Sequence, residues 1–144
     1  MKIRGQIIGE EDLQAALRRT KRATTLRLRG ATEQTAKLMV ARARARLQPG
    51  HGFRFGYLKA ALGYEMKRGA VAIVGIRRGV SPAGFEPGNY AHLVEFGHAG
   101  PRPAPAKPFM LPAAEAVRPD YLNLCRQAGK EIERDAATVG GGFL

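Results

Sequence analysis

Apolar residues in the N-terminal half of the chain recur at the spacing of a helix face. Four of them within residues 31–48 lie four, three and four positions apart, namely Ala36, Val40, Ala43 and Leu47. This spacing places side chains on one side of a helix, and Pro49 and Gly50 follow as a stop signal. We therefore predict a helix over residues 31–48.

The same helix is predicted to begin much earlier in the chain. Acidic residues at positions 10–12 favour a start near Glu10, because negative charge is stabilised at a helix N-terminus. An apolar stripe follows at Leu13, Ala16 and Leu17. Residues 21–30 contain two threonines and Gly30, which weaken a helix without forbidding one. One long kinked helix and two separate helices are both compatible with this pattern, and we favour the continuous one.

The C-terminal region predicts a second helix. Its inward face consists of residues again four, three and four positions apart, namely Tyr121, Cys125, Ala128 and Ile132. Pro112 suits the first turn, where its missing N–H group has no partner to lose. Pro119 lacks the same donor inside the helix, so we expect it to kink or interrupt the helix.

Between the two helices the pattern changes to alternation. The alternating apolar positions are Leu62, Tyr64 and Met66. A turn at Arg68 and Gly69 separates them from a β-rich run of Val71, Ala72, Ile73, Val74 and Ile76. We predict an antiparallel hairpin with one well-buried strand.

The remaining segments show little regular pattern. Four are predicted to be loops, connectors or tails: the glycine- and aromatic-rich residues 51–56, the proline–glycine loop 79–88, the extended proline-rich connector 97–108 and the flexible tail 140–144. Residues 90–96 supply Leu93, Val94 and Phe96 for burial. Together the elements predict an α+β fold, with a long N-terminal helix and a C-terminal helix packed on a small, mostly antiparallel sheet. At 144 residues the chain suits one domain, over residues 1–139, followed by the tail.

The chain is strongly basic. Lys and Arg total 24 against 12 Asp and Glu, a formal charge of +12, and a field of this size attracts polyanions or acidic protein surfaces. Arg42, Arg44 and Arg46 in the predicted N-terminal helix are candidate contacts to DNA or to an acidic partner. Their two-residue intervals spread them around a helix, so a stand-alone nucleic-acid-binding protein is the rival interpretation and not the first one.

Residues that enzymes use are few and poorly spaced. His51, His92 and His98 lack the helical spacing of a zinc hydrolase, and we assign no ligand. Ser81 is the only serine and Cys125 the only cysteine, and neither lies in a nucleophile pattern. We expect no catalytic residue, no metal and no cofactor. No apolar run reaches the roughly eighteen residues of a membrane helix, so we expect no membrane contact.

Two segments together resemble a known family. Residues 90–97 read YAHLVEFG, and residues 108–113 read PFMLPA. This pair is similar to the small tail-completion or head-to-tail joining proteins of lambdoid and related long-tailed bacteriophages, in which a valine-glutamate-aromatic-glycine stretch precedes a proline-phenylalanine pair that opens the final helix. Pro49, Gly56 and Leu58 match the family's proline, its loop glycine and the leucine that begins its first hairpin strand. The positions that we interpret as the fold-defining motif are Tyr90, Val94, Glu95, Phe96, Gly97, Pro108, Phe109 and Pro112.

The resemblance implies a structural virion protein and not an enzyme. Identical subunits would form a ring of six-fold or twelve-fold symmetry around the DNA channel of the neck, assembled in the cytoplasm of a host bacterium. Its neighbours would be a head-side connector or adaptor protein and a tail terminator or tail tube protein. Apolar residues in the predicted loops and tail are the candidate subunit contacts, namely Phe53, Phe55, Tyr57, Phe85, Phe143 and Leu144.

Glu95 and Phe109 also have an interpretation that needs no family. Glu95 lies between Val94 and Phe96, so its carboxylate requires a donor, either a backbone amide or an arginine, and would fix the turn at Gly97. Phe109 lies just before the predicted helix start and is expected to plug the end of the sheet. Both roles are structural.

Overall fold

The computed structural model describes residues 10–48, 55–79 and 86–140, with the backbone alone at residues 10–13, 55, 139 and 140. Its elements are α1 (Glu10–Arg46), α2 (Phe55–Ala61), β1 (Leu62–Met66), β2 (Ala72–Ile76), α3 (Gly88–Phe96) and α4 (Met110–Gly140). This order confirms the predicted α+β class, with a long helix towards each end of the sequence and a small antiparallel sheet between them. The predicted tail lies outside the described residues except for Gly140, the last residue of α4.

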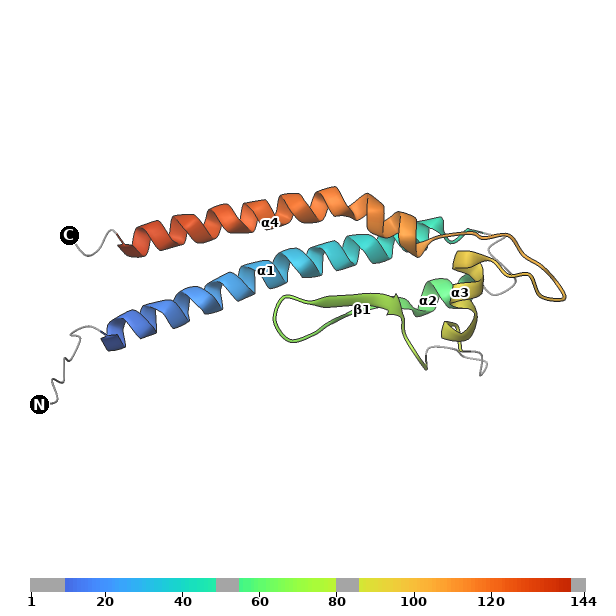
Figure 1. The fold of residues 1–144 in the computed structure, drawn as a ribbon, viewed down its shortest axis with the longest axis horizontal. Coiled ribbons are helices and arrows are strands. Elements are labelled where there is room, and N and C mark those ends of the chain that lie inside the picture. Colours follow the sequence, from blue (N-terminus) through green and yellow to red (C-terminus); the bar gives the residue numbers. More distant parts are fainter. Residues whose placement is uncertain (1–9, 49–54, 80–85, 141–144) are drawn as a thin grey trace, which may run out of the picture.

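The two long helices lie side by side and run in opposite directions (Figure 1). The N-terminal end of α1 and the C-terminal end of α4 therefore lie at the same end of an elongated molecule. α1 spans 37 residues and is continuous through residues 21–30, as predicted. Thr20 and Thr25 donate their hydroxyls to carbonyls four residues earlier, at 3.0 and 2.9 Å, so their polar groups bond within the helix.

α4 continues through Pro119, so of the two outcomes expected there, a kink or an interruption, the interruption is wrong. Arg42 of α1 donates to the carbonyl of Ala116 and, at 2.7 Å, to the carboxylate of Asp120. These contacts hold the turn that contains Pro119, where one backbone donor is missing. Contacts with α1 thus hold α4 on both sides of Pro119.

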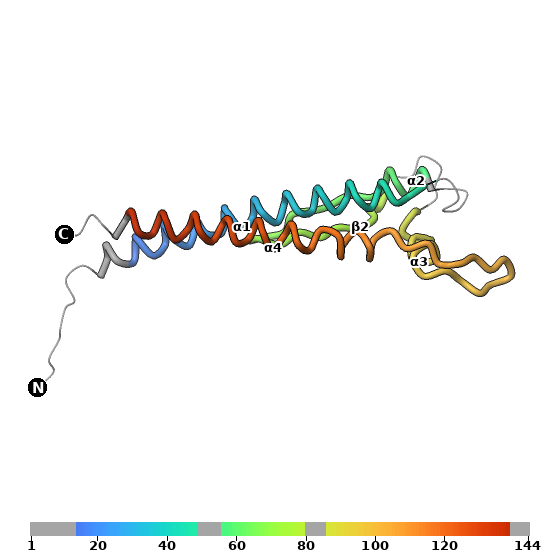
Figure 2. The backbone as a smooth tube through the Cα atoms, turned by 90° about the horizontal axis from the view of Figure 1, so that it is seen from above, coloured from blue at the N-terminus to red at the C-terminus, as the bar shows by residue number. Residues whose placement is uncertain are grey.

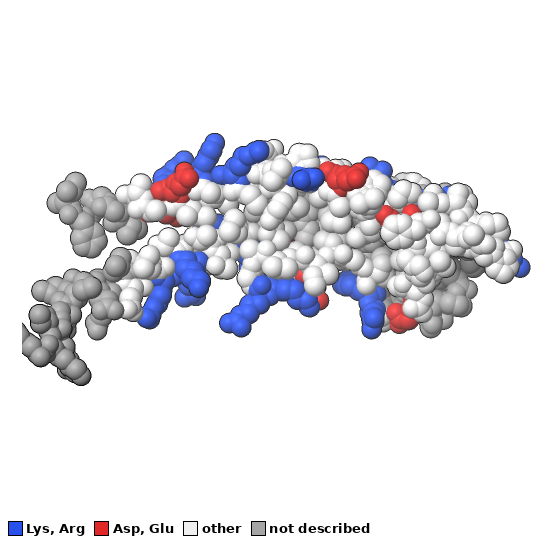
Figure 3. Space-filling view, viewed as in Figure 1, with Lys and Arg blue, Asp and Glu red and all other residues white. Residues whose placement is uncertain are grey.

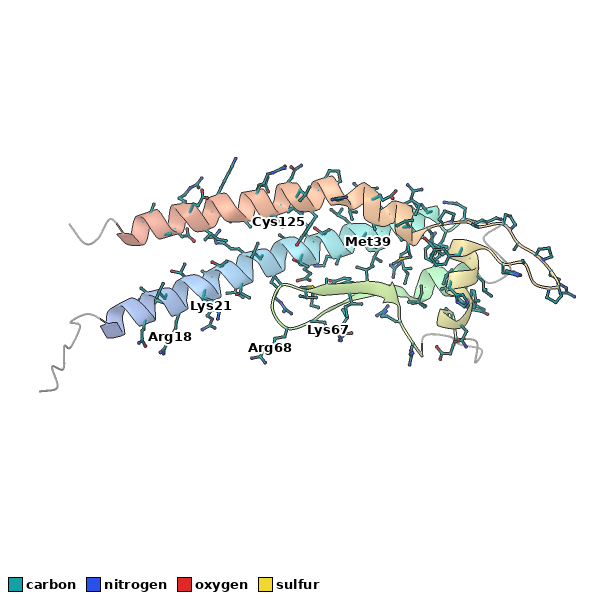
Figure 4. All side chains as sticks on the ribbon, viewed as in Figure 1. Arg18, Lys21, Met39, Lys67, Arg68 and Cys125 are labelled. Carbon is teal, nitrogen blue, oxygen red and sulfur yellow. The ribbon has the colours of Figure 1, made fainter. Side chains whose placement is uncertain are left out.

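The core lies where α1, α2, the hairpin and the start of α4 meet. Its buried cluster consists of Val40, Ala43, Leu47, Leu58, Leu62, Phe109 and Ala113. The predicted inward face of α1 is confirmed, since Ala36 is also buried. On α4 the prediction holds for Ala128, which is buried, and for the half-buried Cys125 and Ile132, whereas Tyr121 is 38% exposed. Cys125 lies on the side of α4 that faces α1 (Figure 4).

The hairpin forms a second layer beneath the helix pair (Figures 1 and 2). β1 and β2 pair antiparallel with Leu62 opposite Ile76 and Tyr64 opposite Val74, which confirms the predicted hairpin. Neither β1 nor β2 is buried along its length, contrary to expectation: Leu62 is fully buried, but Ile73 on β2 is 54% exposed. A two-stranded sheet with helices on one face leaves its other face to solvent.

Two short helices, α2 and α3, were not predicted from the sequence. Leu58 was expected to begin a strand and residues 55–56 to lie in a loop, but all of them belong to α2, and the strand begins at Leu62. Residues 90–96 form most of α3. Pro49 lies outside the described residues.

The connector between α3 and α4 folds back on itself. His98 and Ala104 exchange two backbone hydrogen bonds of 3.0 Å, so the chain does not run straight from one helix to the next. The resulting loop extends past the end of the α1–α4 pair (Figure 2). Its predicted extended path is therefore corrected to a closed loop.

The opposite end of the molecule is more loosely packed. Leu17, expected on an apolar stripe, is 62% exposed. A cleft of about 460 Å³ separates α1 from α4 there, lined partly by Ala16, Ala23 and Ile132. The two helices thus bury less of their apolar surface at this end than at the core.

Candidate functional site

The two segments that carry the resemblance come together at the junction of α3 and α4. Glu95, in the last turn of α3, is only 8% exposed. Its carboxylate accepts backbone N–H bonds from Phe109 at 2.8 Å, Met110 at 3.0 Å and Leu111 at 2.8 Å. A side chain from one helix therefore caps the N-terminus of another, and the expectation that Glu95 finds a backbone donor is confirmed.

The cap accounts for every unpaired donor at the start of α4. The first four amide positions of a helix have no partner inside it. Glu95 takes three of them, and the fourth position is Pro112, which has no N–H group. The carboxylate also places negative charge at the positive end of the helix dipole. The prediction that Pro112 lies in the first turn is confirmed.

Gly97 makes the sharp change of direction after Glu95. Its φ is +73°, a conformation that favours glycine. A Cβ atom at this position would lie 2.7 Å from the backbone nitrogen of Ala106, so the returning connector leaves no room for a side chain. The amide of Lys107 then donates to the carbonyl of Val94 at 2.8 Å, which closes the loop against α3.

Other members of the motif pack into the core. Phe109 is 1% exposed and belongs to the same buried cluster as Leu62, at one end of β1. Tyr90 and Val94 are half-buried against this cluster, whereas Pro108 is exposed. The motif is thus a joint between α3, the connector and α4.

Apolar side chains around this joint remain exposed. Phe96 is 74% exposed, Leu111 58% and Leu93 37%, which corrects the expectation that Leu93 and Phe96 are buried. Phe96 and Leu111 line a cleft of about 400 Å³ together with His92. Leu111 was not among the predicted contacts, although two adjacent apolar residues in a first helical turn, Met110 and Leu111, already imply that one of them faces outward.

The structure describes two of the six predicted subunit contacts. Phe53, Phe85, Phe143 and Leu144 lie outside the described residues. Phe55 begins α2, but its side chain is not described, and Tyr57 is half-buried in the same helix.

Several arginines of α1 hold neighbouring elements in place. Arg44 donates to the carbonyl of Leu62 at 2.7 Å, and Arg29 donates to two carbonyls of the hairpin turn at 2.9 Å. Arg27 bonds two carboxylates of α4, and Arg42 bonds the same helix near Pro119. Of the three predicted DNA or acidic-partner contacts, Arg42 and Arg44 are used within the fold and Arg46 is exposed.

The basic surface is divided. Figure 3 shows Lys and Arg in separate groups along both long edges of the molecule, with Asp and Glu among them. Arg18 and Lys21 point from α1 away from α4 (Figure 4). The visible face therefore carries no single continuous cationic stripe.

One local charge network joins α1 to β1. Lys37 lies 2.9 Å from a carboxylate oxygen of Glu33, and the hydroxyl of Tyr64 donates to the same carboxylate at 3.1 Å. The hydrogen bond from Lys37, followed by that from Tyr64, holds the pKa of Glu33 below its ordinary value. The same contact raises the pKa of Lys37.

Within the described ranges, no three His, Cys, Asp or Glu side chains group closely enough to hold a metal ion. Nor does any helix of that part of the chain combine the length and apolar composition of a membrane span. Comparison with protein-family models, curated protein sequences and solved structures gave no match.

Proposed function

We propose that this chain is a structural subunit of a ring at the head–tail junction of a long-tailed bacteriophage particle. The observation that carries the proposal is the joint between α3 and α4. The two short segments that resemble tail-completion and head-to-tail joining proteins are separated by the connector 98–107, and Glu95 of the first joins the second through three hydrogen bonds. A resemblance spread over unrelated surface positions would not have this coherence.

The exposed apolar residues beside the joint support an assembly role. Phe96, Leu111 and Leu93 are large, apolar and at least one-third exposed. Exposed apolar surface that borders an ordered cleft is typical of protein contact sites. A second copy of this chain is the partner that a ring requires, and each subunit would offer this surface to its neighbour in a heterologous contact. A head-side connector, a tail terminator or tail tube protein and the DNA of the channel complete the proposed environment.

The test is the assembly state of the purified chain. Native mass spectrometry and cryo-electron microscopy should show a closed ring, with six or twelve copies as the expected numbers. Phe96→Ser should shift the population to monomers. Leu17→Ser, at the opposite end of the molecule and also strongly exposed, should leave the ring intact.

Cryo-electron microscopy of the particles supplies the second readout. Density for the ring between head and tail would support the location. A monomer at all concentrations, absent from particles, would overturn the proposal and favour the stand-alone nucleic-acid-binding alternative that the charge of +12 suggests.

A further inference from the structure

A small cationic cleft lies between α1 and the hairpin. It has a volume of about 290 Å³, and its lining residues are Lys37, Val40, Ala41, Arg44, Gly63, Tyr64 and Arg77. Three of these seven side chains are cations, and none is a carboxylate. Positive charges gathered in one cleft repel each other, and a bound anion offsets that repulsion.

The cations come from two sides of the cleft. Lys37 and Arg44 lie seven residues apart on α1, on the same face of that helix. Arg77 follows the end of β2, where its amide donates to the carbonyl of Ala61 at 2.8 Å. Glu33, the partner of Lys37, neutralises only one of the three positive charges.

Arg44 has a buried N–H group without an acceptor among the described residues. Its Nη2 donates to the carbonyl of Leu62 at 2.7 Å, but its Nε is buried and has no hydrogen-bond partner among the described residues. A buried donor left without an acceptor is costly. An anion bound in the cleft that Arg44 lines would lower that cost.

Gly63 allows Arg77 to lie across the cleft. A Cβ atom on Gly63 would be 2.6 Å from Nε of Arg77 and 3.0 Å from its Cδ. A glycine inside a strand often marks such a close approach. The guanidinium of Arg77 forms no hydrogen bond or ion pair with the residues that the structure describes, so its donors are free for a ligand.

We propose that this cleft binds a phosphate oxyanion between Arg44 and Lys37 of α1 and Arg77 of the hairpin. Phosphate fits better than a carboxylate because its oxygens are distributed tetrahedrally and can face donors on both sides, whereas a carboxylate presents two oxygens in one plane. Arginine forks match phosphate oxygens in paired hydrogen bonds. A phosphodiester of nucleic acid and a free phosphate offer the same chemistry. The site belongs to the single chain and does not depend on ring formation.

The test uses three variants of the full chain. Arg77→Gln removes the unpaired cation, and Arg78→Gln removes the same charge from the next residue, which is exposed and does not line the cleft. Gly63→Ala keeps the charge but forces Arg77 out of place. Inorganic phosphate is titrated at constant ionic strength, and binding is followed by amide NMR shifts of residues 63 and 64.

Arg77→Gln and Gly63→Ala should each weaken phosphate binding about tenfold, as loss of one charge-assisted hydrogen bond predicts. Arg78→Gln should change it less than about twofold, because Arg78 does not line the cleft and its charge can act on a bound anion only through screening solvent. The proposal would be overturned if Arg77→Gln and Arg78→Gln lowered the affinity for phosphate equally. It would also be overturned if the unaltered chain showed no saturable binding of phosphate. Arg77 is exposed and bonds no described side chain, so Arg77→Gln remains informative even if Gly63→Ala misfolds.

A DNA duplex identifies the source of the phosphate. If a phosphodiester occupies the cleft, Arg77→Gln should reduce the slope of log affinity against log salt by about 0.9, the value for one phosphate contact, and Gly63→Ala should weaken duplex binding while Arg78→Gln does so less. If Arg77→Gln and Gly63→Ala bind inorganic phosphate more weakly than Arg78→Gln does, but all three bind DNA equally well, the site is supported and its ligand is free phosphate. Specific binding of acidic peptide but not of phosphate would instead make the cleft a protein contact and overturn the proposal.

Discussion

The cap formed by Glu95 gives the sharpest prediction about stability. We consider Glu95→Gln, which keeps the size of the side chain and removes its charge. The carboxylate accepts three backbone N–H bonds, two on Oε2 and one on Oε1. A glutamine retains one acceptor oxygen and presents an NH₂ group where the other oxygen was. That group faces an amide donor and cannot accept from it.

The magnitude follows from the bonds that are lost. If the glutamine oxygen takes the position of Oε2, the bonds to Phe109 and Met110 remain and the bond to Leu111 is lost. Leaving one partly buried N–H donor without an acceptor costs about 1–2 kcal/mol, and losing the charge at the helix N-terminus costs about 0.5–1 kcal/mol more. We expect Glu95→Gln to lower the free energy of unfolding by about 1.5–3 kcal/mol. Glu95→Ala, which strands all three donors, should cost about 3–5 kcal/mol.

The assay combines thermal melting with amide hydrogen exchange. At roughly 4 °C per kcal/mol for a domain of this size, Glu95→Gln should lower the Tm by about 6–12 °C. The amides of Phe109, Met110 and Leu111 should exchange faster than those in the middle of α4. Glu115→Gln makes the same chemical change at an exposed position on α4 and should stay within about 2 °C of the unaltered chain. A Tm for Glu95→Gln equal to that of this control would refute the argument.

Two further predictions concern the connector and the charge network. Gly97→Ala should destabilise the fold by about 2–4 kcal/mol, because an alanine is unfavourable at positive φ and its Cβ would lie 2.7 Å from the backbone nitrogen of Ala106. Chemical denaturation measures this loss. The control is Gly100→Ala, whose Cβ would lie 3.5 Å from the nearest atom and whose free energy of unfolding should stay near that of the unaltered chain. Lys37→Gln should raise the pKa of Glu33 towards its ordinary value, because Lys37 is the main cause of the depression. Since the pKa of Glu33 is lowered in the folded state, this carboxylate stabilises the fold at pH values above its ordinary pKa, and the stabilisation is lost as the pH falls through the folded-state pKa. An NMR titration that finds the same Glu33 pKa in Lys37→Gln as in the unaltered chain would contradict the prediction.

Periodicity in the sequence was sufficient to predict the long elements. Ala36, Val40 and Ala43 are all buried on one side of the C-terminal half of α1, so there the spacing reports burial directly. The alternation at Leu62 and Tyr64 likewise identified the hairpin. What the pattern could not give was the degree of burial, because that depends on how many layers cover each face. Ile73 is apolar in a strand that helices cover on one side only.

Short elements and close approaches were harder to predict. α2 and α3 have seven and nine residues, which is too few for a helical period to stand out from alternation. The cleft at Arg77 depends on a strand pairing that brings Gly63 beside it, and the hydrogen bonds of Arg44 depend on the position of β1. The only sequence feature that could have indicated this close approach was Gly63, a glycine within an alternating strand pattern. The backbone donors that Glu95 binds lie at the start of α4, which begins fifteen residues later at Met110. Local sequence around Glu95 therefore did not identify them.

The exposure of Phe96 follows from the burial of Glu95. Successive residues on a helix are rotated by about 100°, so a turn that directs Glu95 and Ala91 inward directs Phe96 outward. The observed pattern agrees: Ala91 packs on the core, whereas His92 and Phe96 are exposed. A partner that covers Phe96 therefore lies directly beside the cap of α4. Loss of the cap should consequently weaken any assembly through this surface as well as the fold, whereas Phe96→Ser should affect assembly alone. Measuring Tm and ring population for both variants separates the two effects, and a Phe96→Ser variant that melts as early as Glu95→Gln would show that Phe96 is a core residue and not a contact.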